Sequence, residues 1–472
     1  MAVVLGATLA TLALLGVVQL LATPTAPPLT PGSVLLGLGL AAVVCFGVMR
    51  KTTAGVLAWL VVAFIMPALV TTSVPAVARL IFLALAAGWL VGVLSGRHSI
   101  RHFGLVELLM VLFLVYMLGS AIAPHELSAG AVPDVTTLLL TSAVYPFALF
   151  VLLREAAGGE RAVRAFLWTL TAMGGYLALT IIFQKTGLQS LVFPSQILDP
   201  ALGIHPERGR GPLLNSAADG AVLVSCFVAA LHLGTQRDVP GRVVALIVAL
   251  IMPVGVFFTE TRAIWLALGI VVLMGVAFAR GFRRWYIVLV VVALGYLAAN
   301  WQTFLSDDRA AGGVTSSSEV NSRLNDIATH QWAIDQKPVF GWGIARYVTV
   351  NTDHHHHWNN LAWANGMGDI GHNTFLVIAS ELGLIGLGIW LALLAAVGLV
   401  TLRAWRVLPA AGVASRRLVF AFWCASAAWI SIALTIDMRL FAVITAILFA
   451  WAGIITAQLD RATDTVVHRG AP

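Results

Sequence analysis

The chain has 472 residues, of which 60% are hydrophobic and only 10% carry a charge. A soluble domain carries about 25% charged residues, so this composition excludes a soluble globular protein. The formal net charge of +7 comes from basic residues between apolar runs and does not indicate nucleic-acid binding. Runs of about 20 apolar residues recur along the chain, and each is long enough to cross a bilayer as a helix. The sequence therefore predicts an all-α polytopic membrane protein.

The apolar runs predict about 12–14 transmembrane helices. The candidate ranges are 2–22, 34–49, 54–72, 76–95, 104–123, 136–153, 165–184, 218–234, 241–258, 262–279, 285–301, 383–402, 417–436 and 440–458. The first range lacks a basic region before it, so we interpret it as a spanning helix rather than a cleaved signal peptide. Cys45, Cys226 and Cys424 all fall within apolar runs without metal-ligand spacing, as expected of small buried hydrophobes.

The basic residues predict the orientation of these helices. Arg and Lys concentrate in alternate loops, for example at 50–51, 280–284 and 403–417. By the positive-inside rule these loops face the cytoplasm, and so do both termini. Segments 205–220, 258–265 and 302–371 face the other side, yet they contain arginine. The last of them is long and polar among short connections, and such loops are usually functional.

This pattern divides the chain into four parts. We expect N-terminal spans over 1–204, spans that carry arginine motifs over 205–301, an outer loop domain over 302–371, and C-terminal spans that begin with a histidine motif over 372–472. No internal repeat is evident, whereas many transporters are built from repeated halves.

The outer segment "HPERGRGPLLNSAADG" at 205–220 carries two arginines one residue apart in a Gly-rich loop. Arg208 and Arg210 are candidates for a phosphate clamp, because bidentate Arg–phosphate bonds are strong and directional. The alternative is structural pairing of Arg208 with Glu207, or of Arg210 with Asp219.

Arg262 begins a span at the outer interface, in "FTETRAIW". A fixed guanidinium suits phosphate oxygens, although an interfacial Arg can also reach lipid headgroups. Arg323 lies in "SRLNDIATHQWAI", which predicts an amphipathic helix that covers the membrane part as a lid. Its expected apolar face comprises Leu324, Ile327, Ala328, Trp332 and Ile334. The sequence leaves open whether Arg323 binds substrate or stabilises the structure.

The stretch "DIGHNTFLVIASELGLIGLG" at 369–388 places His372 and Asn373 at the start of an apolar helix. Free backbone N–H groups and the positive end of the helix dipole favour an anion there. The same dipole favours a neutral histidine, as a general base must be. Gly383 and Gly386 allow the following helix to pack closely against a neighbour. The alternative is a histidine that merely caps an interfacial helix.

Two further polar groups have mainly structural interpretations. The run "DHHHHW" at 353–358 suggests a metal site, but consecutive histidines point in different directions and a site needs fixed ligands. We therefore interpret His354–His357 as part of a solvated loop near a polar substrate. Asp437 and Arg439 lie in the short outer turn "TIDMRLF", where charges close to hydrocarbon usually pair or line a polar cavity.

Four of these segments follow one another between residues 205 and 388. They are "RGRGPLLN", "TETRAIWLAL", "SRLNDIATHQWAIDQKPVFGWG" and "HN" followed by nine residues and "GLIG". On these residues the chain resembles the O-antigen ligase / O-antigen polymerase superfamily of bacterial membrane glycosyltransferases. The first 200 residues resemble the family only in being membrane spans.

The match is close but not complete. The first segment is similar to the family's Arg-x-x-Gly-x-x-x-Asn motif, with Arg208, Gly211 and Asn215 in register, but Ser and Ala follow where the family often has Pro and Asn. In the second, Thr261 precedes Arg262 in place of the usual Ser. The third resembles the family's outer Arg-helix-Pro-x-x-Gly-x-Gly segment, and the fourth matches its His-Asn-x9-Gly-x-x-Gly signature.

The resemblance implies a GT-C-like fold and a reaction. Family members take a glycan from an undecaprenyl-pyrophosphate carrier at the outer face of the cytoplasmic membrane and pass it to an acceptor hydroxyl. The partners implied are that donor, a glycan or glycolipid acceptor and membrane lipids, without nucleic acid, cofactor or metal, and the expected outcome is inversion at the anomeric carbon. The implied catalytic residues are His372 as the base and Arg262; the implied substrate-binding residues are Arg208, Arg210, Asn215, Arg323 and Asn373.

Other functions remain open on the sequence. We favour a ligase that attaches a finished glycan to an envelope anchor, and a polymerase that joins lipid-linked repeat units uses the same motifs. Family members that glycosylate proteins rank third. A transporter of lipid-linked glycans would carry charges deep within its spans, whereas the middle of nearly every span here is uncharged.

Overall fold

The computed structural model describes residues 51–69, 74–97, 103–130, 133–236, 238–279, 283–299, 301–305, 317–363 and 365–469. The predicted spans 2–22 and 34–49 lie outside these ranges. The described residues form helices joined by loops, and no strand occurs among them. Seven of these helices are long and apolar enough to cross a membrane, and four shorter apolar helices accompany them. The expected all-α polytopic membrane fold is therefore confirmed.

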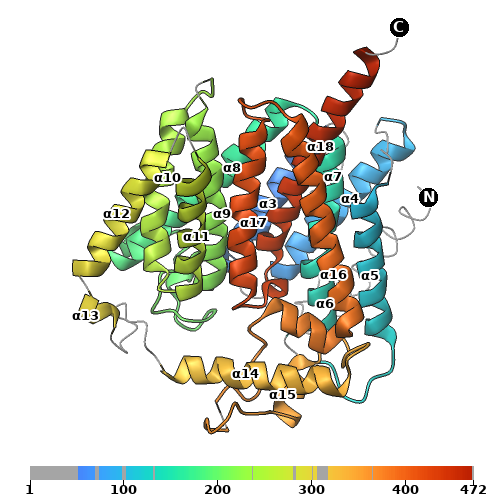
Figure 1. Ribbon diagram of the computed structural model, residues 1–472, viewed down its shortest axis with the longest axis vertical. Coiled ribbons are helices and arrows are strands. Elements are labelled where there is room, and N and C mark those ends of the chain that lie inside the picture. Colours follow the sequence, from blue (N-terminus) through green and yellow to red (C-terminus); the bar gives the residue numbers. More distant parts are fainter. Residues whose placement is uncertain are drawn as a thin grey trace, which may run out of the picture.

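Most helices run side by side in one bundle (Figure 1). Their bounds are α3 (Thr52–Leu69), α4 (Val74–Leu94), α5 (Leu105–Ile122), α6 (Val135–Leu139), the π-helical turn η1 (Leu140–Val144), α7 (Tyr145–Ala156), α8 (Glu160–Lys185), α9 (Ser216–Thr235), α10 (Arg242–Phe258), α11 (Arg262–Phe278), α12 (Arg283–Ala299), α16 (Thr374–Val407), α17 (Arg416–Ala433) and α18 (Ala442–Arg469). Short elements between them are η2 (Gln189–Leu191), η3 (Ser195–Leu198), α13 (Trp301–Phe304) and η4 (Met438–Leu440).

Helices α9 and α18 form the centre of this bundle. In each, 94% of the apolar window is buried within the protein, against 33% for α5 and α16 at the periphery. Helix α9 packs against α8, α10 and α17, while α18 packs against α7 and α16. Because no water is present in the bilayer core, hydrogen bonds within each helix must satisfy its backbone groups. The apolar all-round composition of α9 follows from its central position.

Two helices of the predicted outer domain cross one end of the bundle. They are α14 (Ser317–Gln336) and α15 (Tyr347–Asp353), and we call them, with loops 337–346 and 354–371, the outer layer (Figure 1). Hydrogen bonds attach this layer to the last turn of α5 and to the segment that follows it. The N–H of Ile344 donates to Ser120 Oγ (3.1 Å), and Nε of Arg346 donates to the carbonyl of Leu127 (2.9 Å).

A break at Gly383 joins the outer layer to the bundle. Gly383 has φ 69° and ψ −176°, so α16 consists of a short helix before it and a long one after it. The break exposes backbone groups, and loop 337–343 pairs with them: the N–H of Gly343 donates to the carbonyl of Glu381 (2.8 Å), and the N–H of Leu384 donates to that of Pro338 (2.8 Å). A side chain at Gly383 would collide with the carbonyl of Val339, 2.1 Å from an added Cβ.

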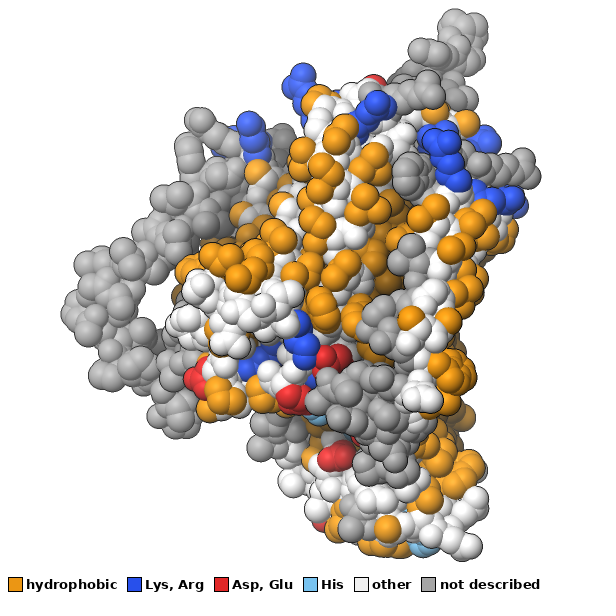
Figure 2. All heavy atoms as spheres, turned by 90° about the vertical axis from the view of Figure 1, so that its left-hand side faces the viewer, with side chains coloured by type: hydrophobic (Ala, Val, Ile, Leu, Met, Phe, Trp, Pro, Cys, Tyr) orange, Lys and Arg blue, Asp and Glu red, His pale blue; other side chains and the backbone are white. Residues whose placement is uncertain are grey.

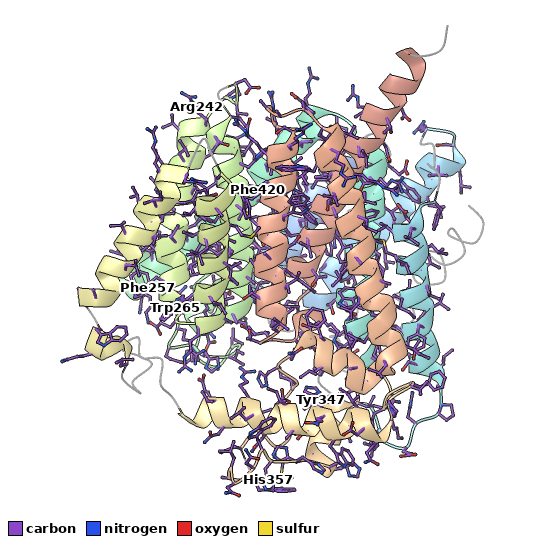
Figure 3. The ribbon with its side chains drawn as sticks, viewed as in Figure 1. Arg242, Phe257, Trp265, Tyr347, His357 and Phe420 are labelled. Atoms are coloured by element: carbon purple, nitrogen blue, oxygen red, sulfur yellow. The ribbon has the colours of Figure 1, made fainter. Side chains whose placement is uncertain are left out.

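The basic loops lie at the opposite end of the bundle. Figure 2 shows Lys and Arg side chains at its upper end, and Figure 3 shows Arg242 at the end opposite Tyr347 and His357 of the outer layer. Helix α18 also ends on that side (Figure 1). This arrangement fits a membrane protein whose two faces differ in charge, as the positive-inside rule describes.

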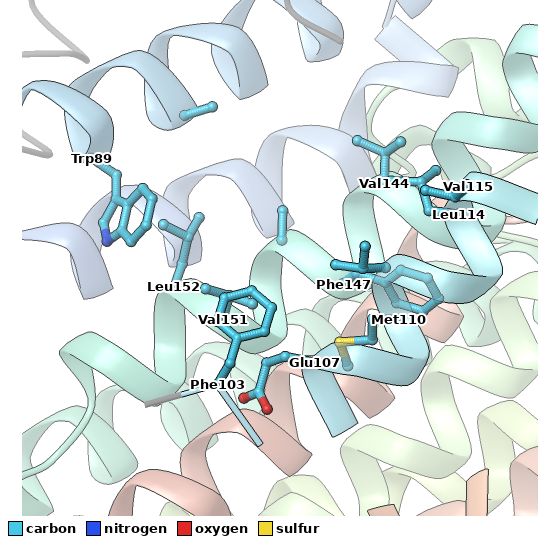
Figure 4. Close-up of a pocket in the computed structure, with 13 residues that line it drawn as sticks. Trp89, Phe103, Glu107, Met110, Leu114, Val115, Val144, Phe147, Val151 and Leu152 are labelled. Carbon is cyan, nitrogen blue, oxygen red and sulfur yellow. The ribbon is translucent and has the colours of Figure 1, made fainter. Parts of the chain in front are cut away.

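An apolar pocket opens between α4, α5 and α7 (Figure 4). Its lining includes Trp89, Met110, Phe147 and the carboxylate-bearing Glu107. Glu107 pairs with Arg154 and lies in the first turn of α5, whereas the outer layer follows the last turn. At 1.5 Å rise per residue this separates Glu107 from the outer layer by about 20 Å. The pocket therefore lies apart from the predicted histidine and arginines.

Candidate active site

The loop that carries Arg208 is folded by Arg210. The guanidinium of Arg210 is 1% exposed and donates to the carbonyls of Ile197 (3.1 Å), Asp199 (2.7 Å) and Leu202 (2.6 Å). These bonds use three of its nitrogens for the chain's own backbone. The structure therefore gives Arg210, predicted to bind substrate, a loop-ordering role at its present position.

Asn215 and Asp219 fix the other end of the same loop. Oδ1 of Asn215 caps α9 by accepting from the N–H groups of Ala217 (3.0 Å) and Ala218 (3.1 Å). The buried carboxylate of Asp219 accepts from the N–H of Gly211 (2.7 Å). It does not pair with Arg210, so the structural alternative, which proposed that pairing, does not hold. A side chain on Gly211 would meet Asp219 Oδ1 at 2.8 Å, so this approach requires glycine.

Arg208 projects from this ordered loop towards acidic neighbours. Its Nε lies 3.4 Å from Glu207 Oε1, and its Nη2 lies 3.4 Å from Oε1 of Glu319 in the first turn of α14. Burial lowers the pKa of Arg208, and the negative charges of Glu207 and Glu260 act in the opposite direction. The predicted pairing with Glu207 is present, and the contact with Glu319 links the arginine loop to the outer layer.

Arg262 is the first residue of α11 and is held by a rigid turn. The indole N–H of Trp265 donates to the carbonyls of Val256 (3.2 Å) and Phe257 (3.1 Å), and its ring stacks on Phe257 (Figure 3). Nε and Nη2 of Arg262 are buried and have no hydrogen-bond partner among the described residues. Arg262 also lies close enough to Arg208 for the two charges to repel each other. A guanidinium with two buried nitrogens that lack a partner is costly beside a second guanidinium unless an anion neutralises them.

Arg323 and the histidine motif meet at the turn after α17. Arg323, in α14, is close enough to Arg208 for electrostatic repulsion. Burial lowers the pKa of Arg323 to about 10, while the charges of Asp326 and Asp369 favour its ionised form. Its Nη1 approaches the carbonyl of Thr435 at 3.5 Å. Asn373 donates to the adjacent carbonyl of Leu434 (3.1 Å), so the Arg323 helix and the histidine motif share the turn after α17.

His372 stands directly before the N-terminus of α16. Asn373 caps this helix through Oδ1, which accepts from the N–H groups of Phe375 (3.0 Å) and Leu376 (3.1 Å). The side chain of His372 is 21% exposed, and its Nδ1 lies 3.7 Å from Oδ2 of Asp326. The structure thus brings Arg208, Arg262, Arg323 and His372 into one connected polar region, while Arg210, Asn215 and Asn373 order the backbone around it.

A family comparison covers part of this candidate site. Residues 246–391 match a family model described as O-Antigen ligase, and this range contains Arg262, Arg323 and His372. Over this range the chain is similar to the O-antigen ligase family. No curated protein matches the chain. The similarity supports a glycosyltransferase-like membrane enzyme that handles lipid-linked glycan donors and acceptors in the general sense of this family.

A buried ion cluster lies at the predicted Asp437–Arg439 turn. The guanidinium of Arg439 contacts Asp437 Oδ2 and Glu381 Oε2, each at 2.9 Å, and all three side chains are at most 4% exposed. The neighbouring carboxylates raise the pKa of Arg439 above its usual range, against the effect of burial. Glu381 also accepts the N–H of Tyr347 (3.1 Å). The turn therefore supports the outer layer through a salt bridge. Of the two predicted roles, charge pairing and lining a polar cavity, the structure shows the pairing.

The four consecutive histidines pack mainly on tryptophans. His354 and His356 each stack on Trp332, with ring centroids 4.9 Å apart, and His357 lies 4.9 Å from Trp363. His355 is buried, and its Nδ1 lies 2.6 Å from Oδ1 of Asn351. The run is consequently part of the packing of the outer layer, and only His357 projects as a largely exposed side chain.

The sequence analysis did not single out the interior of the outer layer around the candidate site. The buried face of α14 is polar: Asn325, Asp326, Thr329 and His330 are each at most 2% exposed. In contrast, Ile327 from the expected apolar face is 39% exposed. The polar side chains recur at i, i+1, i+4 and i+5, which is the spacing of one helix face. This polar stripe could have predicted the buried face of α14. The sequence analysis instead followed the apolar residues of the helix.

Proposed function

We propose that the protein transfers a glycan from an undecaprenyl-pyrophosphate carrier to an acceptor hydroxyl, as an O-antigen ligase, at the outer face of the bacterial cytoplasmic membrane. Both termini would lie in the cytoplasm. The reaction would be metal-independent and would invert the anomeric carbon. The carrier lipid would lie against the bundle and its glycan against the outer layer, because the predicted site stands at their border.

The unpaired guanidinium of Arg262 carries this proposal. Arg208 has carboxylate neighbours in Glu207 and Glu319, and Lys185 pairs with Glu260 at 2.5 Å. Arg262 has no acidic partner among the described residues. Guanidinium groups bind phosphate oxygens in a bidentate geometry. A pyrophosphate between Arg262 and Arg208 would neutralise both charges and would be stabilised further as it leaves.

The reaction also needs a base that removes the proton of the acceptor hydroxyl, and His372 is that base in the proposal. The acceptor oxygen attacks the anomeric carbon while the bond from that carbon to the pyrophosphate oxygen breaks, and the electron pair leaves with the pyrophosphate. The proton of the acceptor hydroxyl passes to the imidazole of His372. General-base catalysis of this kind contributes about 10²–10⁴-fold to the rate. Because attack and departure occur on opposite sides of the carbon, the product has the inverted configuration.

The test uses the purified full chain with an undecaprenyl-pyrophosphate-linked glycan, candidate acceptors and a metal chelator, and follows free carrier pyrophosphate. We expect Arg262→Ala and His372→Ala to bind donor but to lower kcat about 100-fold or more. Arg262→Lys should recover part of the activity, since an ammonium retains the charge and loses the bidentate fork. NMR of the new linkage reports its anomeric configuration.

Arg242→Ala is the matched control, because Arg242 is also the first residue of a bundle helix, but at the opposite end. It should turn over as the wild type does. Wild-type rates in His372→Ala or Arg262→Ala would overturn the assigned roles. Products that grow by whole repeat units would indicate a polymerase instead, and absence of carrier release with every acceptor would favour a transporter.

A further inference from the structure

A single carboxylate, that of Asp326, lies behind the histidine motif. Asp326 is 2% exposed. Its Oδ1 accepts from the hydroxyl of Tyr347 (2.6 Å), and its Oδ2 accepts from the backbone N–H of His372 (2.9 Å). The same Oδ2 lies 3.7 Å from Nδ1 of the His372 ring. The carboxylate is therefore fixed by two hydrogen bonds and directed at one nitrogen of the predicted base.

The two ring nitrogens of His372 are in different environments. Nδ1 is buried and has no hydrogen-bond partner among the described residues, while about a fifth of the side chain remains exposed. Since a buried ring nitrogen without a partner is costly, Nδ1 calls for an acceptor, and Asp326 is the nearest carboxylate. A hydrogen bond requires about 3 Å, so a shift of about 0.7 Å closes it. Catalytic hydrogen bonds are often long before substrate binds.

We propose that Asp326 is the positioning residue of His372: its carboxylate accepts the Nδ1 proton and thereby presents Nε2 of the imidazole to the acceptor hydroxyl. The proposal rests on the proposed function, in which His372 is the base. When Nε2 takes the acceptor proton, the ring becomes an imidazolium with a proton on each nitrogen. The negative charge of Asp326 stabilises that cation, and Asp326 keeps its charge throughout the step.

A second imidazole beside Asp326 cannot take this role. Nε2 of His330 also lies 3.7 Å from the carboxylate, but the His330 side chain is fully buried. Its Nδ1 is 2.8 Å from Ser380 Oγ, and its ring stacks on Tyr347 at 3.8 Å. Burial lowers the pKa of His330 far below its usual value. His330 thus remains neutral and enclosed, and it packs behind the carboxylate.

The charges around Asp326 decide when it is ionised. Burial raises its pKa to about 7, while the hydroxyl of Tyr347 and the positive charge of Arg323 lower it. Asp369 and Asp437 raise it further, and Arg439 acts on the nearby His330. The carboxylate is therefore ionised above about pH 7 and increasingly protonated below it. This predicts an acid limb in the rate profile to which Asp326 contributes.

The test compares wild type, Asp326→Asn, His372→Ala and the double variant in the transferase assay, after thermal unfolding has shown that each is folded. We expect D326N to lower kcat about 100-fold with the KM for donor within about 2-fold of wild type. Its acid limb should move to lower pH, because the carboxylate of Asp326, whose pKa burial raises to about 7, no longer titrates. The double variant should be no slower than His372→Ala alone.

Asp335→Asn is the control, since Asp335 lies on the same helix but is exposed. It should leave both kcat and the pH profile unchanged. Effects of D326N and His372→Ala that multiply in the double variant would show that Asp326 acts independently of His372, and would overturn the inference. Should D326N not fold, Asp326→Ser carries the test: a wild-type kcat in it overturns the inference, and a reduced kcat with the acid limb moved to lower pH supports it. An active His372→Ala would instead defeat the proposed function.

Discussion

The bundle and the outer layer are held together in opposite ways. In the bundle, most buried positions of α9 and α18 are apolar, and each helix satisfies its own backbone hydrogen bonds. In the outer layer the buried positions include Asn325, Asp326 and His330, which bond to side chains and loop carbonyls. Apolar packing tolerates small shifts at modest cost, whereas a buried polar network loses a full desolvation penalty for each partner removed.

This difference has a functional consequence for an enzyme at a membrane border. A polar interior can fix a histidine and its partners to a few tenths of an ångström, but it cannot exist in contact with hydrocarbon. The outer layer therefore stands beyond the apolar bundle and is attached to it at a few points. Among the described residues these include the Gly383 break and the Arg439 ion cluster. Perturbing those points should affect the two regions unequally.

The largest effect is expected from Arg439→Ala. It leaves Asp437 and Glu381 as unpaired buried carboxylates, which costs about 3–5 kcal/mol of the free energy of unfolding. Thermal unfolding in detergent should show the loss, and hydrogen exchange should place it in the outer layer and the end of the bundle beneath it. Leu223→Ala in the centre of α9 should cost about 2–5 kcal/mol while exchange in the outer layer stays unchanged. Equal exchange patterns in the two variants would contradict the division into two regions.

A smaller effect is expected from Gly383→Ala. The new Cβ would meet the Val339 carbonyl at 2.1 Å, and the left-handed φ adds strain, so the cost is about 3 kcal/mol. Limited proteolysis should cut loop 337–343 faster while the bundle remains intact. Gly388→Ala, on the same helix, has open space around its Cβ and should be neutral or stabilise by up to about 1 kcal/mol. Similar melting temperatures for the two variants would show that the break does not hold the outer layer.

The smallest effect is a pH dependence confined to the outer layer. Burial raises the pKa of Asp326 from 3.8 to about 7, so between these values the folded state holds a proton that the unfolded state has lost. Its contribution to stability therefore falls as pH rises through this window, by at most about 1.4 kcal/mol per pH unit. The lowered pKa of His330 has the opposite effect on stability. Below pH 6.5 the unfolded state binds the extra proton, so the contribution of His330 to the free energy of unfolding rises with pH.

The two slopes offset each other in the wild type. In Asp326→Asn only the His330 slope remains, so the free energy of unfolding should rise with pH up to about 6.5 and then level off. Melting temperatures of both proteins between pH 4.5 and 7.5 measure the difference. Parallel curves for wild type and D326N would mean that Asp326 does not change its protonation on folding.

Much of the architecture was predictable from local chemistry. Apolar runs of membrane-spanning length specify helices wherever they occur, since an unpaired backbone is intolerable in hydrocarbon. The helix start at the histidine motif and the start of a span at 383 were also predicted, whereas the cap by Asn373 and the break at Gly383 were found only in the structure. Arginine and histidine are scarce on the predicted outer side of this hydrophobic chain. This scarcity made candidates of Arg208, Arg262, Arg323 and His372.

The sequence by itself determined the membrane-spanning helices and the few polar residues that lie at one end of the bundle, but not which face of α14 is buried. Only the tertiary structure decided which of those residues remain unpaired. Arg210 and Arg262 look alike in the sequence, yet loop carbonyls surround the first, while two nitrogens of the second have no partner. Asp326 acquires its place behind His372 from a chain segment 46 residues away. Such pairings depend on how distant segments pack, which no local pattern of residues specifies.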